Sequence, residues 1–385
     1  MTRNRIARQC ASVLLAGLAL VGGGSAVAQS DQKVTVQGRA DDEPKVLNVY
    51  NWSDYIGDDT IANFEKETGI KVHYDLMDSN EILHAKMVAG KTGYDIVVAA
   101  SNWAKLEIDG GLIQKLDKSK IPNLKDMDPT LQAAVAKADP GNEHLVIWAW
   151  GYSTIGINPA KVKAALGDLP MPDNEWDLLF DPKYVSRLKS CGVSFFDSPS
   201  DVIPPALAYV GRNPWSKDPA DYAEAAKMLA KVRPYVTLFS SSGYINDMAN
   251  GSLCVALGWN GDLNIARKRA QDAKNGNVVE ALVPKKGGFV FFSTMAIPAD
   301  AQHPGNAHKW INYILRPEVN AGITNKVFYA TPNVQAAKFV RPDIRQNKSV
   351  YPDAAAIKAM VQPQPPASDI RRLMTRTYTQ FKTGE

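Results

Sequence analysis

The fold is decided by the stretch Val46-Leu47-Asn48-Val49-Tyr50-Asn51-Trp52-Ser53-Asp54-Tyr55. Its first half alternates apolar and polar residues, which is typical of a β-strand buried on one face. It ends in an aromatic ring, a hydroxyl, a carboxylate and a phenol. Because ligands of open α/β sheets lie just beyond the carboxyl ends of strands, we expect a cleft here. Trp52 and Tyr55 would face the methylenes of a cationic ligand and Asp54 its charge. The alternative is that the two rings are packing residues and Asp54 is a turn residue.

The residues that follow repeat a strand-helix rhythm. Residues 71–76 alternate like a second strand, and residues 80–89 have helical spacing before Gly90. Residues 94–100 form a continuous apolar run, which is typical of a parallel strand covered on both faces. This order predicts a doubly wound α/β sheet. The segment 101–103 follows the third strand and is expected to line the same cleft.

A long extended stretch occupies the middle of the chain. Residues 145–150 are apolar and rich in tryptophan, and residues 152–158 continue in the same extended pattern. The stretch predicts a strand that crosses from one lobe to another, with two ordinary strands in one sheet as the alternative. A second strand-helix series begins at Pro159. A chain of 385 residues is also long for one core, so two or three domains are expected.

The amino terminus has the three parts of an export signal. Basic residues begin it, residues 11–21 are apolar, and Ala26-Val27-Ala28 matches a cleavage site. We therefore expect a signal peptide over residues 1–28, cleaved after Ala28, and a flexible polar leader over residues 29–44. A transmembrane anchor is the alternative, but it needs about 20 apolar residues. No later segment is long and apolar enough to span a bilayer, so the mature protein is predicted to lie in a bacterial periplasm.

Composition and charge indicate a globular protein. Hydrophobic residues make up 45% of the chain and charged residues 22%. Arg3, Arg5 and Arg8 leave with the signal, so 41 of the 44 basic residues remain against 40 acidic residues. This balance gives no reason to expect nucleic acid or an anionic membrane as a partner.

The cysteines predict one disulfide. Cys10 leaves with the signal, which leaves Cys191 and Cys254 in an oxidising compartment. Two buried free thiols are the alternative. A zinc site is not expected from two cysteines without nearby histidines.

Aromatic and acidic residues recur where the predicted strands end. The groups are Trp52 with Asp54, Asp197 with Asp201, Trp259 with Asp262, and Phe291 with Tyr329 nearby. No lysine or arginine stands beside them in these motifs. They therefore predict a negative, partly apolar lining that suits a flexible aliphatic cation.

An enzymatic function finds little support. None of the five histidines falls in a strand-end cluster, and neither G-x-S-x-G nor H-E-x-x-H occurs. Acids with aromatic platforms also form sugar sites, so a secreted carbohydrate-active hydrolase is the enzymatic alternative. No spacing identifies its acid/base pair. We expect a binding protein, not an enzyme, and no cofactor or metal.

Five segments closely resemble the periplasmic putrescine/spermidine-binding proteins of ABC importers. They are Tyr50-Asn51-Trp52-Ser53-Asp54-Tyr55, Ser190-Cys191-Gly192-Val193-Ser194-Phe195, Tyr244-Ile245-Asn246-Asp247-Met248-Ala249-Asn250-Gly251, Gly258-Trp259-Asn260-Gly261-Asp262 and Val327-Phe328-Tyr329-Ala330. The resemblance spans nearly all of the mature chain. It implies a type II periplasmic binding fold, in which two doubly wound α/β lobes, joined by crossover segments, close on a polyamine in the cleft between them. The first lobe would comprise residues 45–148 with 289–337, and the second residues 149–288 with 338–385.

The resemblance also implies partners. These are a polyamine ligand such as putrescine or spermidine, and an inner-membrane ABC permease with its ATPase. The binding protein itself is expected to be a monomer. It implies the disulfide between Cys191 and Cys254 as well. A sensory or scavenging role is the alternative to transport.

Carried over by position, the resemblance implies a set of ligand-binding residues. They are Trp52, Ser53, Asp54, Tyr55, Asp201, Ser241, Trp259, Asp262, Phe291, Ser293 and Tyr329. Asp201 stands where these binders usually have a glutamate. Ser293 replaces a second aspartate that grips an amine, and Ala100 replaces a serine. A lost charge-assisted contact is worth about 1.5–3 kcal/mol, which predicts weak putrescine binding or a related ligand such as agmatine, cadaverine or an ω-amino acid.

Overall fold

The computed structural model describes residues 43–385, and within them nine strands form one sheet. The order is β2-β1-β3-β9-β4-β7-β5-β6, and β8 pairs with β4. The strands are β1 (Val46–Trp52), β2 (Lys71–Met77), β3 (Ile96–Ala100), β4 (Val146–Ile157), β5 (Val193–Phe195), β6 (Leu238–Phe239), β7 (Val255–Trp259), β8 (Glu280–Ala281) and β9 (Phe289–Ala296). The expected signal peptide, its cleavage site and most of the leader lie outside the described residues.

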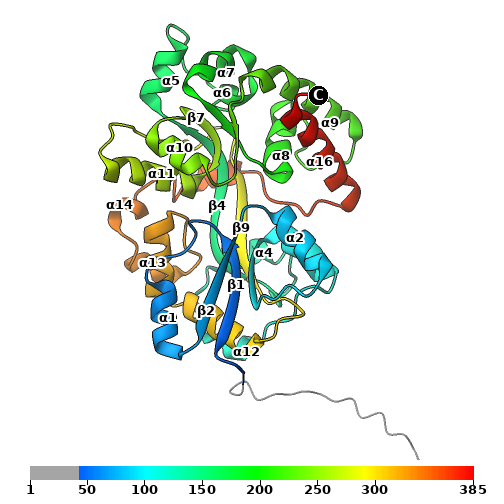
Figure 1. Ribbon diagram of the computed structural model, residues 1–385, viewed down its shortest axis with the longest axis vertical. Helices are drawn as coiled ribbons and strands as arrows, with labels where there is room; N and C mark the ends of the chain where they lie inside the picture. The colour runs from blue at the N-terminus through cyan, green and yellow to red at the C-terminus, as the bar shows by residue number, and fades with distance from the viewer. Residues whose placement is uncertain (1–42) are drawn as a thin grey trace, which may run out of the picture. The chain divides into compact units, whose positions relative to one another are not determined.

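Two sets of parallel strands flank an antiparallel centre. Strands β2, β1 and β3 are parallel to one another, and so are β7, β5 and β6. Between the two sets, β9 and β4 pair antiparallel with each other and with their outer neighbours β3 and β7. Figure 1 shows β4 and β9 running together through the middle of the ribbon.

Strand β4 is the long strand that the middle of the sequence predicted. All twelve of its residues are buried; residues 146–153 pair with β9 and residues 153–157 pair with β7. The prediction of one continuous strand is confirmed, and the alternative of two separate strands is wrong. One strand therefore belongs to both halves of the sheet.

Helices connect and cover the strands. Their bounds are α1 (Thr60–Thr68), α2 (Asn80–Ala89), α3 (Ser101–Asp109), α4 (Pro129–Val135), α5 (Pro159–Leu166), α6 (Asp177–Phe180), α7 (Pro182–Leu188), α8 (Pro199–Tyr209), α9 (Pro219–Val232), α10 (Tyr244–Asn250), α11 (Asn260–Ala273), α12 (Pro304–Ile314), α13 (Pro317–Val327), α14 (Pro342–Arg345), α15 (Ala354–Ala359) and α16 (Ser368–Thr383). The last helix, α16, packs against α8 and α9 (Figure 1). In the part of the chain that the structure describes, no helix is long and apolar enough to cross a membrane.

The local reasons for these elements are visible at their ends. Helix α2 occupies the predicted residues 80–89, and it begins where the Ser79 side chain accepts a hydrogen bond from the Ile82 N–H. Helix α1 ends at Gly69, whose φ of 71° is the left-handed conformation that glycine adopts readily. Local sequence chemistry thus places the helices between the strands.

The predicted disulfide is present. Cys191 and Cys254 are bonded, with 5.4 Å between their Cα atoms, and they join the segments that lead into β5 and β7. The alternative of two free thiols is therefore wrong. A cross-link that closes a loop of this length contributes about 4 kcal/mol in the chain-entropy model.

Candidate functional site

A cavity of about 880 Å³, counted to its open mouth, lies where several strands end and the following helices begin. Ten of the eleven residues expected in the site line it: Trp52, Ser53, Tyr55, Asp201, Ser241, Trp259, Asp262, Phe291, Ser293 and Tyr329. The lining includes no lysine, arginine or histidine from residues 43–385, and three aspartates make it negative.

Asp54 is the expected residue that does not line the cavity. It sits in a turn after β1 with a φ of 53°, and its Oδ1 accepts a hydrogen bond from Arg269 Nη2 at 2.6 Å. The Asp197 carboxylate is likewise paired with Lys382, at 2.7 Å. The sequence motifs around Asp54 and Asp197 contain no basic residue, but the fold gives each of these two acids a cationic partner. Each basic partner comes from a distant part of the chain.

Asp262 is the most enclosed acid of the cavity. It lies in the first turn of α11 and is only 5% exposed. Two hydroxyls hold its carboxylate: Tyr329 O–H donates to Oδ1 at 2.6 Å, and Tyr244 O–H donates to Oδ2 at 3.0 Å. Burial raises the pKa of this carboxyl to about 7, although both tyrosine hydrogen bonds act in the opposite direction. Its nearest partners are thus neutral donors, which leaves its charge available to a cation.

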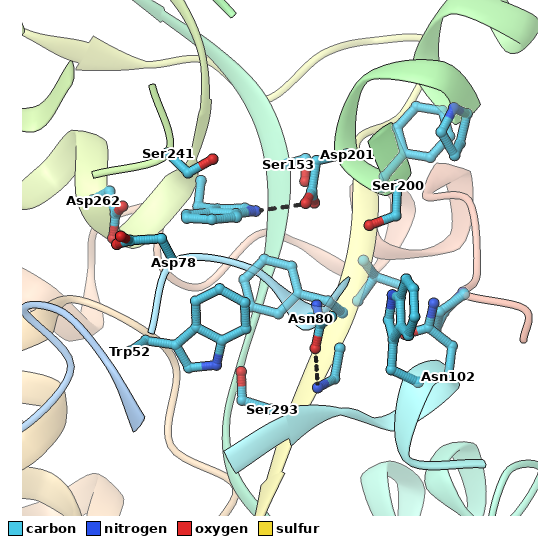
Figure 2. Close-up of a pocket in the computed structure, with 18 of the residues that line it drawn as sticks. Trp52, Asp78, Asn80, Asn102, Ser153, Ser200, Asp201, Ser241, Asp262 and Ser293 are labelled. Atoms are coloured by element: carbon cyan, nitrogen blue, oxygen red, sulfur yellow. Dashed lines mark hydrogen bonds between the residues drawn. The ribbon is translucent and has the colours of Figure 1, made fainter. Parts of the chain in front are cut away.

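Asp201 is the second enclosed acid. It lies in the first turn of α8, where Ser198 Oγ–H donates to Oδ2 at 2.7 Å and the Trp259 indole N–H donates to Oδ1 at 3.4 Å. Figure 2 shows the bond from the indole. Burial, together with the nearby Glu81 carboxylate, raises the pKa of Asp201 to about 7. Glu81 itself accepts a hydrogen bond from the Ser200 N–H at 3.2 Å, so a residue of α2 contacts the start of α8.

Aromatic rings form a continuous wall between the acids. Their edges and faces meet at centroid distances of 4.8–6.5 Å. The contacts run from Trp52 to Trp259, Phe291, Tyr329 and Tyr55. Such a wall suits both methylene groups and the positive charge of an ammonium group.

Gly261 is required by this wall. A Cβ atom at this position would lie 2.3 Å from the Tyr329 ring, closer than any real Cβ contact. A glycine beside Asp262 therefore lets Tyr329 reach the carboxylate. This gives a physical reason for the sequence Gly258-Trp259-Asn260-Gly261-Asp262.

Another part of the cavity is polar but uncharged. Ser293 of β9 lies opposite Ala100 of β3 in the sheet register. Tyr55 O–H donates to Ser293 Oγ at 3.0 Å, and the Ala100 N–H donates to Asn80 Oδ1 at 3.0 Å. Ser293 is 5% exposed and Asn80 7%, so both are enclosed.

Several lining residues were not in the predicted ligand-binding set. They are Met77, Asp78, Asn80, Ala100, Asn102, Trp103, Ser153, Ser200, Pro204, Pro205, Trp215, Phe289, Val290 and Pro363. The rule that sites lie at strand ends already pointed to the segment 101–103, and applied to β2 it would have found Asp78 and Asn80. Trp215 and Pro363 follow no strand, so the same rule could not have found them.

Comparison with known proteins places the chain in a family. The family model described as bacterial extracellular solute-binding protein matches residues 59–351. The putrescine-binding periplasmic protein SpuD of Pseudomonas aeruginosa is 46% identical over 342 residues, 89% of this chain and 93% of the relative. The putrescine-binding periplasmic protein PotF of Escherichia coli is also 46% identical, over 346 residues, 89% of this chain and 93% of the relative.

A solved structure of a related binding protein has a similar fold. The spermidine/putrescine ABC transporter substrate-binding protein PotD of Streptococcus pneumoniae is 26% identical, with a TM-score of 0.69, over 89% of this chain and 99% of that chain. The type II periplasmic binding fold and the family resemblance, both expected from the sequence, are thereby confirmed. This chain belongs to the bacterial extracellular solute-binding protein family.

Proposed function

We propose that this protein captures a polyamine, a putrescine-like diamine or spermidine, in the periplasm and delivers it to an ABC permease. Two of its relatives are named as putrescine-binding periplasmic proteins, which supports this ligand class. The observation that carries the proposal is the buried Asp262 carboxylate, which two neutral tyrosine hydroxyls hold in a cavity lining without a basic residue from 43–385. A buried carboxylate without a cationic partner is complementary to an ammonium group.

In this proposal binding involves no reaction. An ammonium group meets Asp262, and the aromatic wall packs against the methylenes of the ligand. The other binding residues are Trp52, Ser53, Tyr55, Asp201, Ser241, Trp259, Phe291, Ser293 and Tyr329. Asp54 contributes through its ion pair with Arg269, which joins the end of β1 to α11, and not through contact with the ligand.

The proposal includes closure of two lobes around the ligand. One lobe comprises residues 45–148 with 289–337, and the other residues 149–288 with 338–385. Ligand binding favours the closed form to the extent that the ligand contacts it better than the open form. The closed, monomeric protein, exported and cleaved after Ala28, then docks on the inner-membrane permease that its ATPase drives.

A thermal-shift screen of the purified mature protein tests the proposal. The compounds are putrescine, cadaverine, agmatine, spermidine, spermine and two ω-amino acids, with glucose and maltose as uncharged controls. We expect amines to raise the melting temperature and the sugars to leave it unchanged. The Asp262→Asn variant should still unfold in one cooperative transition without ligand, and it should lose the response to amines. A response to sugars, or no response to any amine, would overturn the proposal.

A further inference from the structure

The part of the cavity around Asn80 offers hydrogen-bond donors. The Ala100 N–H donates to Asn80 Oδ1 at 3.0 Å. Since only the oxygen of an amide can accept that bond, the orientation of the Asn80 side chain is fixed. Figure 2 shows the other end of the amide, Nδ2, turned away from this bond and toward the middle of the cavity. Nδ2 donates to no group among residues 43–385, so it is free to donate to a ligand.

Ser293 offers a second donor close by. Its Oγ accepts the Tyr55 hydroxyl proton at 3.0 Å, so its own hydroxyl proton remains available. Ser293 lies opposite Ala100 across the β3-β9 pair, and the Ala100 N–H is the group that fixes Asn80. The two donors thus flank one backbone position. Figure 2 shows this pair on the other side of Trp52 from Asp262.

A second ammonium group would be poorly placed beside these donors. An ammonium group has only hydrogens to offer, and it needs acceptors. The acids that line the cavity are Asp78, Asp201 and Asp262, and none of them is hydrogen-bonded to Asn80 or Ser293. A ligand carboxylate would also be unfavourable, because the described lining holds three aspartates and no basic residue. A neutral carbonyl oxygen satisfies both donors without an unpaired charge.

The cavity also has room beyond the donors. It continues past Asn80 to Asn102, on the side away from Asp262 (Figure 2). Trp103 and Pro363 also line the cavity, and each is next in sequence to a residue of the contact between Asn102 and the Gln364 carbonyl. A small apolar substituent on the carbonyl carbon, such as a methyl group, would lie against these residues.

We infer that the preferred ligand is a mono-N-acylated diamine, with its one ammonium group at Asp262 and its carbonyl oxygen at Asn80 and Ser293. The inference rests on the proposed function, because it assumes an amine at Asp262. It narrows the ligand from doubly charged amines to singly charged ones that carry a neutral acceptor.

Calorimetric titration with putrescine and N-acetylputrescine tests this inference. The two ligands share one carbon chain and differ in a single charged end. The wild-type protein should bind N-acetylputrescine more tightly, by about tenfold or more, since each unpaired buried group costs of the order of one hydrogen bond. Equal affinities, or tighter binding of putrescine, would overturn the inference while amine binding stood. If neither ligand bound, the proposed function would fail as well.

Two variants then test whether Asn80 and Ser293 cause the preference for N-acetylputrescine. Asn80→Asp keeps the shape and the oxygen that accepts the Ala100 N–H, but it replaces the donor by an acceptor. This variant should bind N-acetylputrescine about tenfold more weakly and should prefer putrescine. Ser293→Asp changes the neighbouring donor and should reverse it independently, so a folding defect in one variant leaves the other decisive. An unchanged preference in a folded variant would contradict the inference.

Asn63→Asp is the matched control for added charge. Asn63 lies on α1, is exposed and does not line the cavity. The variant introduces the same chemical change, and both affinities should stay within about twofold of wild type, as for a distant surface charge. A reversal in this control as well would show that net charge, and not the donor at Asn80, sets the preference.

Discussion

Asp262 and Asp54 are two carboxylates from similar motifs with opposite surroundings. Both follow the end of a strand and a tryptophan, and the sequence suggested the same role for both. Asp262 is 5% exposed and held by neutral hydroxyls, whereas the Asp54 side chain is 39% exposed and paired with Arg269. A hydroxyl donor leaves a carboxylate its charge, whereas a guanidinium group neutralises it. The comparison teaches that the partner of an acid, more than its motif, decides whether the acid can hold a cationic ligand.

The largest expected effect separates these two acids. Asp262→Asn should weaken amine binding by about 10- to 150-fold, which corresponds to the 1.5–3 kcal/mol of a hydrogen bond to a charged group. Asp54→Asn removes only an exposed ion pair, worth about 0.2–1 kcal/mol, and should weaken binding by less than about sixfold. Isothermal titration of both variants measures the difference. Equal losses would mean that the two acids do not differ in role.

The pH dependence of binding should reflect the enclosed acids. Burial raises the pKa of Asp262 to about 7, and an ammonium group binds the ionised form. Affinity should therefore fall by about tenfold between pH 8 and pH 6 as protons compete with the ligand. Asp201, whose pKa burial also raises to about 7, would add to the effect if its charge contributes. Titrations across this range in wild type and Asp262→Asn test it. The variant should lose the part of the pH dependence that comes from Asp262. A pH profile identical to that of wild type would contradict the role of Asp262 in binding the ammonium group.

Ionisation of Asp262 also changes the stability of the folded protein with pH. The folded-state pKa of Asp262 lies above the ordinary value of 3.8, so the ligand-free folded protein binds more protons than the unfolded chain between these values. This contribution is favourable at low pH and is lost as the pH rises from about 4 to about 7. The asparagine side chain of the Asp262→Asn variant cannot ionise, so the melting temperature of this variant should rise relative to wild type over this window. Calorimetry without ligand measures the difference, and a difference independent of pH would contradict the raised pKa.

A smaller effect is expected from the hydroxyl that holds Asp262. Tyr329→Phe removes the 2.6 Å hydrogen bond to Oδ1 and keeps the ring in the aromatic wall. This bond acts on the ligand only through Asp262, so its loss should cost less than the loss of the carboxylate, about 0.5–1.5 kcal/mol, and affinity should fall by about 2- to 12-fold. The midpoint of the pH profile should move upward, because this bond favours the ionised carboxyl. An upward shift without loss of melting temperature would exclude a folding defect, whereas a downward shift would contradict this role.

Much of the site could be predicted because it follows local rules. Strand-end positions carry the chemistry of open α/β sheets, and the motifs around Trp52 and Trp259 each place an aromatic ring at such an end. The helix at residues 80–89 could be predicted from its spacing and its glycine stop. These features depend on neighbours within a few residues, which a sequence displays directly.

The partners of the acids could not be predicted in the same way. Arg269 and Asp54 are 215 residues apart, and Lys382 and Asp197 are 185 residues apart, so only tertiary structure brings each pair together. Tyr244 likewise contacts Asp262 from a different helix. The free donor of Asn80, the first residue of α2, depends on one backbone N–H of β3. Sequence patterns identify the charges of a site, whereas the hydrogen-bond partners that decide their use come from the fold.

The smallest expected effect tests whether the Asp54 ion pair acts on its own. Arg269→Met removes the guanidinium group but keeps an unbranched apolar side chain on α11. Both side chains are about a third exposed, so the pair should contribute only about 0.2–1 kcal/mol to amine binding. In a double-mutant cycle, Asp54→Asn with Arg269→Met should then cost no more than either single variant, because each removes the same interaction. If Arg269→Met instead tightened binding in the Asp54→Asn background, the arginine would be opposing the ligand charge, since its positive charge also acts on Asp262. That result would mean that Asp54 and Asp262 do not act independently and that both belong to one electrostatic network with Arg269.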